Sequence, residues 1–565
     1  MSRPDVEVLV VGGGPVGLSM SICLSRLGVT SRVVERHPTT TNHPKATVVN
    51  TRTMELFRQW GVEAAVVEGA VPADRMRCIV WATTLAGPEI GRLEVASDVA
   101  RLAASGRLSP SIQRICPQDV VEPALATVAR QSDLTEISFG TELEQFEITD
   151  GGITATLRQA DGVTEYVTSR YLVGADGVGS SVRSALGVDL VGDRDLGRLL
   201  NINIRADLGP WVDDRPGPLY WIVNPDVPGV FIALDGVERW LFNTPWGAEE
   251  TPDDATCVRM VQRAVGSSDV DVHVESALPW TAHSLVASSF RSGPCFLVGD
   301  AAHQFPPTGG HGMNSGIQDA HNLSWKLAAV LRGDAGDALL DTFETERRPV
   351  AERYAAESVR NAAGQRVSGR SIPPAIEEDT DEGRGIRELV ASTIPGQRGH
   401  FVSPGLQLGL GYESTAVVPD DHSPADAAGD VTDDVTEYRP VVAAGFRAPH
   451  VWIGSPDDDP RRSLLDEFDG RFTLLTRDAS SGRAAGATAL GVHVVAVDPE
   501  GVATAYQLDH DHAVLVRPDG IIAKVWRSEA DRSTLHEVLQ HVLSLESGVA
   551  GAVRPPRDGD RSARP

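Results

Sequence analysis

The sequence predicts an α/β protein, α+β overall, because three apolar strands each run into a glycine turn and then a helical pattern. The turns lie at residues 12–17, 174–177 and 299–300. Open α/β sheets bind ligands at the carboxyl ends of their strands, where turns of this kind lie. We therefore predict a Rossmann-like nucleotide-binding domain that is assembled from three separate parts of the chain.

The first turn has the glycine spacing of a dinucleotide-binding loop. After an apolar run at 6–11, Gly12, Gly14 and Gly17 match G-x-G-x-x-G ahead of a helix. Gly12 permits a tight turn, Gly14 admits a pyrophosphate to the backbone, and Gly17 lets helix and strand pack closely. Glu35 ends the next strand, where it can accept hydrogen bonds from ribose hydroxyls. A glycine-rich turn without a ligand is the alternative interpretation.

The second turn carries Asp176, Gly177, Ser180 and Arg183 with the spacing D-G-x-x-S-x-x-R. Alone, this pattern is equally typical of a strand end followed by a helix that Ser180 caps. Its place between the other two turns favours a role in the same ligand site.

The third turn, within residues 298–326, is the most informative part of the chain. Gly299 and Asp300 follow an apolar strand, a Pro/Gly loop comes next, and a helix is expected from about Met313 and Asn314. A carboxylate and the positive end of a helix would then face one planar ligand. This arrangement suits the pyrimidine edge of a flavin, which becomes anionic on reduction.

In this order, the three motifs resemble those of the single-component FAD-dependent aromatic hydroxylases, the class A flavoprotein monooxygenases. The chain looks most similar to the phenol and 2,4-dichlorophenol hydroxylase-like members, which include polyketide-tailoring enzymes. The resemblance covers residues 1 to about 365 strongly. It extends weakly through a C-terminal part that resembles the family's thioredoxin-like domain.

The resemblance implies a role for each matching residue. The three glycines of the first turn hold the FAD pyrophosphate, Glu35 holds the adenosine ribose, and Asp300 bonds to the ribityl chain. Pro307 lies beside the flavin carbon that carries the peroxide, and the N–H groups of Met313 and Asn314 face flavin N1 and O2. The implied cofactor-binding set is Gly12, Gly14, Gly17, Glu35, Arg36, Lys45, Arg114, Gln118, Asp176, Arg183, Gly299, Asp300, Pro307, Gly310, Gly312, Met313 and Asn314.

Three positions leave alternatives open. Lys45 stands where relatives usually carry an arginine, and without the planar fork of donors a bidentate contact to FAD or NADPH is in question. Gln118 is the best match in a helix expected within 111–125, and a solvated helix face is its alternative. Arg52 and Glu55 match the family pattern, or they form an ordinary ion pair on a helix surface.

The implied activity is hydroxylation of a phenolic or heteroaromatic compound. NADPH, favoured over NADH by resemblance only, would reduce FAD and leave, and a flavin C4a-hydroperoxide formed with O2 would give one oxygen atom to the ring. Pro307 and His311 are the candidate catalytic residues, and the base that would deprotonate a phenol is not identified. Four aromatic residues could line the substrate pocket, although ordinary sheet core is the favoured interpretation of each: Trp221, Phe231, Phe242 and Trp246.

Two other classes of function stay open. A flavin-dependent oxidase, or a Baeyer–Villiger-type enzyme that tailors a polyketide or another natural product, could carry the same motifs. The mass of the product separates these activities from hydroxylation. A flavin-binding protein without catalysis is the third interpretation, and the intact loop at 306–314 argues against it.

The order of the expected elements divides the chain. The predicted domains are a discontinuous FAD-binding domain at 1–75, 105–185 and 290–365, and an antiparallel-sheet substrate domain at 76–104 and 186–289. The remaining regions are a linker with irregular packing and a short helical segment at 366–435, a thioredoxin-like domain without C-x-x-C at 436–550, and a disordered tail at 551–565. In the substrate domain, strands are expected at 200–206, 218–223, 229–234 and 239–244. We expect the C-terminal domain to be structural or to form an oligomer contact, as in a homodimer.

Composition narrows the choice of partners. A net charge of −27 disfavours nucleic acid and anionic membranes. No apolar run approaches the ~18 residues of a membrane span, and a basic signal segment is absent from the start. Five cysteines without C-x-x-C spacing, and histidines without ligand spacing, predict a cytoplasmic protein with reduced thiols and no metal.

Overall fold

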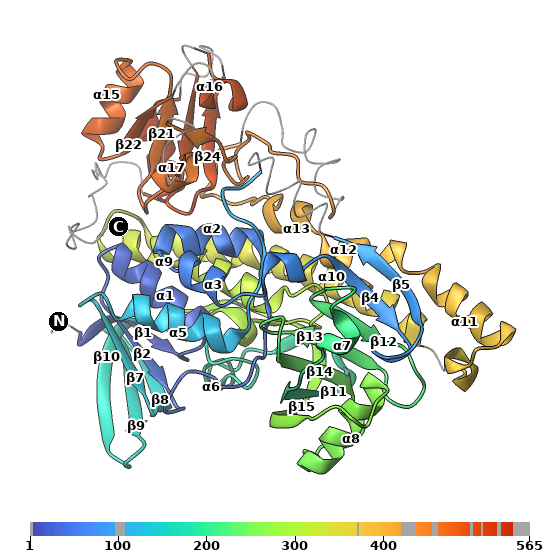
Figure 1. Cartoon of the computed structure of the whole chain (residues 1–565). Coiled ribbons are helices and arrows are strands. Elements are labelled where there is room, and N and C mark those ends of the chain that lie inside the picture. The colour runs from blue at the N-terminus through green and yellow to red at the C-terminus, as the bar shows by residue number, and fades with distance from the viewer. Residues whose placement is uncertain are drawn as a thin grey trace.

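The computed structural model describes residues 4–95, 108–369, 372–419, 435–454, 461–497, 501–509, 512–527 and 533–545. The predicted disordered tail at 551–565 lies outside these ranges, as do parts of the predicted regions 76–104, 366–435 and 436–550. Two eight-stranded sheets and one four-stranded sheet carry most of the fold (Figure 1).

The first sheet brings the three glycine turns to one edge. Its path is β16 (Arg291–Ser292), β17 (Cys295–Leu297), β10 (Thr164–Gly174), β1 (Val6–Val11), β2 (Ser31–Glu35) and β7 (Thr135–Phe139). All neighbours from β17 to β7 are parallel, and the register sets Val11 beside both Val34 and Gly174, which in turn lies beside Leu297. The strands therefore end together, as the apolar runs before the turns predict. Helices α1 (Pro15–Arg26) and α9 (Gly312–Leu331) begin at this edge.

The middle sheet is mostly antiparallel and lies beside the first (Figure 1). Its order is β18 (His303–Gln304), β15 (His273–Ala287), β11 (Leu190–Arg205), β14 (Arg239–Pro245), β13 (Gly229–Ala233), β12 (Leu219–Ile222), β4 (Cys78–Ala82) and β5 (Glu89–Glu94). The four expected strands correspond to β11, β12, β13 and β14, whereas the long strand β15 is not among them. Helix α8 (Asp254–Val265) packs on one face of the sheet.

Residues 372–419 contain several short helices within an otherwise irregular segment. Helix α11 (Asp381–Ala391) buries Val390 against Ile79 and Trp81 of the middle sheet, and α12 (Arg398–Phe401) and α13 (Pro404–Leu408) follow it. Farther on, the chain pairs with the C-terminal part: the Tyr412 N–H donates to the Gly445 carbonyl at 2.9 Å. This stretch therefore covers the middle sheet at one end and joins the C-terminal part at the other.

The C-terminal sheet contains β22 (His493–Ala496), β21 (Thr473–Thr476), β23 (Ala513–Val516) and β24 (Ile522–Trp526). Strands β21 and β22 are parallel and connected by α15 (Gly482–Ala489), whereas the other pairs are antiparallel. The sheet lies over α9 and α2 (Thr51–Trp60), on the side of these helices away from the first sheet (Figure 1). Trp325 of α9 meets Phe472 edge-on, with ring centroids 5.8 Å apart, so one apolar core spans both parts.

Candidate functional site

The first glycine turn is close-packed on one side and open on the other. Gly12 has φ +110°, and a Cβ there would lie 2.3 Å from the Ala175 carbonyl oxygen, while one on Gly17 would lie 1.9 Å from the Gly12 oxygen. A Cβ on Gly14 would meet only the Glu122 Oε1 atom, at 3.9 Å. Gly12 and Gly17 thus seat the turn against its neighbours, and Gly14 leaves space where a pyrophosphate fits.

Glu35 is fixed beside this turn by backbone donors. Its Oε2 accepts the Gly13 N–H at 2.8 Å, and its Oε1 accepts the His37 N–H at 2.9 Å. The carboxylate keeps further lone pairs that could accept hydrogen bonds from a ligand. Arg36 is exposed next to it.

Helix α5 (Gln118–Ala129) fastens the following loop at residues 41–46. Glu122 accepts the Thr41 N–H at 2.7 Å and the Gln118 amide at 2.6 Å, and the Gln118 carbonyl oxygen accepts the Ala46 N–H at 3.2 Å. Burial raises the pKa of Glu122 above its usual range. Lys45 is exposed in this loop. Its positive charge offsets part of the rise that burial causes in the pKa of Glu122 and of Asp300. Lys45 therefore stands near both the first and the third turn.

The third turn presents Asp300 beside the start of α9. Burial among protein atoms raises the pKa of Asp300, partly offset by His303 and Lys45, although its side chain is exposed on one side. A Cβ on Gly312 would lie 3.7 Å from the Asp300 Oδ1 atom. Within the described ranges, the Asp300 carboxylate has no hydrogen-bond partner. Asp300 is thus available to a ligand.

The first turn of α9 is equally open. Among the described residues, the backbone N–H groups of Gly312, Met313 and Asn314 have no acceptor, whereas the side chain of Asn314 is fully used. That side chain accepts the Asn50 N–H at 2.9 Å and donates to the Val48 and Gly310 carbonyls at 2.9 and 2.7 Å. The helix therefore offers free donors and its positive end, which suit the N1 and O2 side of an anionic flavin.

A buried ion pair supports the third turn from behind. Asp319 accepts the Gly299 N–H at 3.1 Å, His303 Nε2–H at 2.7 Å and Arg347 Nε–H at 2.7 Å. Burial alone would raise the pKa of Asp319, but His303 and Arg347 outweigh it and lower the value to about 2. Gly299 has φ +59°, a conformation that favours glycine. Nothing in the local sequence pattern singles out Asp319.

The second turn braces the third. Ser180 caps the helix α6 (Ser181–Ala185), as in the alternative interpretation of this turn, and Asp176 accepts the Ser180 and Ser181 hydroxyls. Arg183 donates to the Ala301 carbonyl at 3.0 Å, next to Asp300, and to the Val178 carbonyl at 3.0 Å. Arg114 lies on β6 (Arg114–Ile115), ahead of the helix in which the sequence places it.

The loop before α9 places the two candidate catalytic residues differently. Pro307 is exposed, whereas His311 is buried and its ring stacks on Tyr354 with centroids 4.8 Å apart. Burial lowers the pKa of His311 to about 4, so the ring is neutral at pH 7. The pKa of His400, on α12, is lowered to about 3, mainly by burial and to a smaller extent by the nearby His311. Sequence reasoning missed His400.

The middle sheet separates the four predicted pocket residues onto different faces. Phe231 and Phe242 are directly paired, with ring centroids 4.5 Å apart, and both lie in the fully buried core beneath α8. Trp246 packs at the edge of that core and donates to the Glu250 carbonyl at 3.0 Å. Trp221 points to the opposite face, where its ring centroid lies 6.4 Å from that of His400.

The face that carries Trp221 is mixed: Trp221 packs with the apolar residues Ile79 and Trp81, and polar side chains lie on the neighbouring strands. The register places Trp221, Val230, Asn243 and Asn201 side by side on neighbouring strands. The Trp221 Nε1 and Asn243 Oδ1 atoms are buried and have no hydrogen-bond partner within the described ranges. On the same face, Ser276 Oγ lies 2.8 Å from His43 Nδ1. This face therefore looks toward the loop that holds Lys45.

No metal or membrane feature accompanies the site in the described ranges. No group of three His, Cys, Asp or Glu side chains is placed to hold a metal ion. The described helices also lack the combination of length and apolarity that a membrane crossing requires. All five cysteines are buried and free.

Comparison with known proteins agrees with this geometry. Residues 5–358 match the family described as FAD binding domain, and residues 442–544 match the family described as aromatic-ring hydroxylase, C-terminal. The chain is 35% identical to tetracenomycin A2 monooxygenase-dioxygenase of Streptomyces glaucescens, over 98% of this chain and 99% of that one. It is 32% identical to 2,4-dichlorophenol 6-monooxygenase of Cupriavidus pinatubonensis, over 97% and 98%.

A solved structure gives the same answer. The flavin-dependent monooxygenase PieE, in complex with FAD and substrate, superimposes with a TM-score of 0.86 at 33% identity, over 96% of this chain and 100% of that one. The predicted resemblance is confirmed by both kinds of relative. The open glycine turn, Glu35, Asp300 and the free N-terminus of α9 fit FAD in this fold. This chain belongs to the FAD-dependent aromatic hydroxylases.

Proposed function

We propose that this protein hydroxylates a phenolic or heteroaromatic compound with NAD(P)H and O2. NAD(P)H gives two electrons, one oxygen atom of O2 enters the ring, and the other leaves as water. The observation that carries the proposal is that Asp300 lies beside the free N-terminus of α9, near the face of the middle sheet that carries Trp221. When bound, FAD supplies the redox chemistry and the activation of O2.

The residues of the chain would orient and protect this chemistry. Gly14 and Glu35 would hold the pyrophosphate and the adenosine ribose, and Asp300 the ribityl chain. The N–H groups of Met313 and Asn314 would stabilise negative charge at the flavin edge without reorganisation during the reaction. Pro307 would shape the adjacent space and limit access of water. These assignments rest on the geometry above and on family membership.

Substrate recognition is proposed at the face of the middle sheet that carries Trp221. Trp221 offers an apolar ring and an N–H, and Asn243 offers an amide oxygen, so a flat phenol with both donor and acceptor groups would suit this face. His311 is neutral at pH 7 and would accept a hydrogen bond from a phenol rather than carry a proton. Tetracenomycin A2 monooxygenase-dioxygenase and 2,4-dichlorophenol 6-monooxygenase support an aromatic substrate of this type.

Three further assignments complete the proposal. The predicted domain boundaries are kept, because each sheet is built from the parts of the chain assigned to it, except for the short strand β18, which comes from 290–365 and joins the middle sheet. A thioredoxin-like C-terminal domain is supported by the parallel β21–β22 pair and the antiparallel β23–β24 pair. Five buried, free thiols support a cytoplasmic location. A homodimer is the proposed oligomer.

The visible spectrum of the purified protein is the first test. Flavin bands, together with NADPH consumption stimulated by one class among simple phenols, hydroxypyridines and polycyclic phenols, would support the proposal. A product heavier by one oxygen atom, with its ring intact, would separate hydroxylation from oxidase or Baeyer–Villiger chemistry. Absence of bound flavin after addition of FAD would overturn the proposal.

A further inference from the structure

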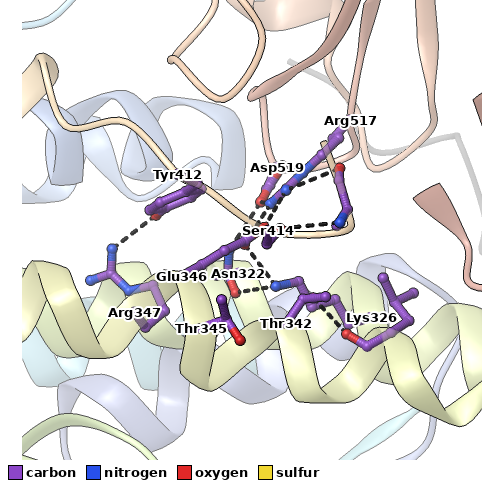
Figure 2. A network of polar contacts seen from close by, with 12 residues as sticks. Asn322, Lys326, Thr342, Thr345, Glu346, Arg347, Tyr412, Ser414, Arg517 and Asp519 are labelled. Carbon is purple, nitrogen blue, oxygen red and sulfur yellow. Dashed lines mark hydrogen bonds and ion pairs between the residues drawn. The ribbon is translucent and has the colours of Figure 1, made fainter. Parts of the chain in front are cut away.

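One turn of the C-terminal part reaches the two helices behind the flavin turn. Residues 517–520 connect β23 and β24, and the turn is closed by the Gly520 N–H, which donates to the Arg517 carbonyl at 2.9 Å. The Arg517 side chain is completely buried. Figure 2 shows Arg517 and Asp519 facing Glu346 and Asn322, with the segment that carries Tyr412 and Ser414 beside them.

This turn holds both helices at once. Arg517 donates to both carboxylate oxygens of Glu346 on α10 (Asp341–Gly369), at 2.6 and 2.9 Å. Its Nε–H donates to Asp519 Oδ1 at 3.0 Å, and Asp519 Oδ2 accepts the side chain of Asn322 on α9 at 3.3 Å. A bidentate pair fixes geometry as well as energy, so α9 and α10 are clamped from the C-terminal side.

The neighbours of the clamped residues hold the flavin turn. Arg347 directly follows Glu346 on α10, and Asp319 precedes Asn322 by one turn on α9. Arg347 binds Asp319, which accepts the Gly299 N–H. A second connection runs through Tyr412: its hydroxyl accepts Arg347 Nη1–H at 2.9 Å, and the Arg517 guanidinium lies 5.7 Å from its ring centroid.

We propose that Arg517 is a positioning residue for the flavin turn. By fixing α9 against α10, it holds the Arg347–Asp319 pair and, through Gly299, sets the position of Asp300 and of the free N–H groups of α9. Buried charge networks couple their members strongly because unpaired charges in a low-dielectric interior are costly. The inference rests on the FAD site of the proposed function and gives the C-terminal part a role that does not involve dithiol chemistry.

A double-mutant cycle on FAD affinity tests this inference. Arg517→Met is expected to raise the FAD dissociation constant of the full-length apoprotein about tenfold and to change the visible bands of the bound flavin. In the Asp319→Asn background, where the relay is already cut, the same substitution is expected to change the constant less than about twofold. Arg517→Lys, which keeps the charge, should restore part of the affinity.

A control variant and two contrary results complete the test. Arg462→Met removes an exposed arginine that pairs with Glu467 in the same C-terminal part, and it should leave FAD affinity unchanged. Equal effects of Arg517→Met in both backgrounds, or no effect in either, would overturn the positioning role. If Arg517→Met fails to fold, Arg517→Lys in the two backgrounds provides the same comparison. Wild-type protein that binds no FAD would overturn the proposed function as well, whereas failure of the cycle alone would not.

Discussion

Polar groups behind α9 differ from those at its start in whether they are paired with other protein groups. Behind the helix, Asp319, Glu346, Arg347 and Arg517 are buried, and each is paired with protein partners. At its start, the Asp300 carboxylate and the first N–H groups have no partner within the described ranges. An unpaired polar group is costly unless water or a ligand satisfies it. The paired groups behind α9 therefore stabilise the fold, and the unpaired groups at its start are suited to bind a ligand.

The largest expected effect comes from removing one charged partner from the paired region. Glu346→Ala leaves the buried Arg517 and Lys326 without their shared carboxylate, and should lower the free energy of unfolding of the apoprotein by about 3–5 kcal/mol. Glu352→Ala, on the same helix, removes an exposed carboxylate that pairs with Arg348 and should cost less than about 1 kcal/mol. Urea unfolding followed by circular dichroism gives both values. Equal losses of unfolding free energy in the two variants would contradict the idea that the buried network stabilises the fold more than an exposed ion pair does.

The next effect separates binding from stability. Asp300→Ala should raise the FAD dissociation constant about 10–100-fold, because a charge-assisted hydrogen bond to the ligand is lost. Unfolding of the apoprotein should stay unchanged, since this carboxylate has no partner among the described residues. Asp341→Ala, which removes an exposed partner of Arg291, is the matched control for both measurements. Full FAD affinity in Asp300→Ala would remove Asp300 from the site.

The unpaired region was largely predictable because its signals are local. Each strand, turn and helix start lies within about twenty residues of sequence, so the positions of Gly12, Gly17 and Glu35 could be placed, and the Ser180 cap could be offered as an alternative. The start of α9 at Gly312 falls within one residue of the expected position. The groups at these turns come directly after a strand, and a strand with its adjoining turn can be recognised from the local sequence.

The paired region could not be predicted, because its partners are distant in sequence. Arg517 and Glu346 are 171 residues apart, and no periodicity links them. Arg52 and Glu55 form the ion pair that was one of two alternatives, yet it is buried rather than on the surface, and Arg447 also binds Glu55 at 3.0 Å. Likewise, the favoured interpretation as sheet core holds for Phe231 and Phe242, but an aromatic pattern cannot say that Trp221 lies on the opposite face.

A smaller effect is expected at low pH, where protonation of Asp319 removes its contribution to the free energy of unfolding. The pKa of Asp319 is lowered from 3.8 to about 2, so the unfolded chain binds this proton before the folded protein does. Its contribution to stability, about 2 kcal/mol, is therefore present above pH 4 and is lost as the pH falls toward 2. The difference in unfolding free energy between wild type and Asp319→Asn should narrow over that range. A constant difference would show that Asp319 does not titrate in this way.

The smallest effect concerns Lys45, which belongs to the open region but contributes only a charge. Because Lys45 is exposed, Lys45→Met should raise the FAD dissociation constant only about two- to fivefold at low salt, and the difference should fade as salt screens it. Lys45→Arg should bind FAD at least as tightly as wild type, since the guanidinium restores a planar fork of donors. A loss in Lys45→Arg equal to that in Lys45→Met would instead mean that the compact ammonium is the group the site requires, and that charge alone does not explain the lysine.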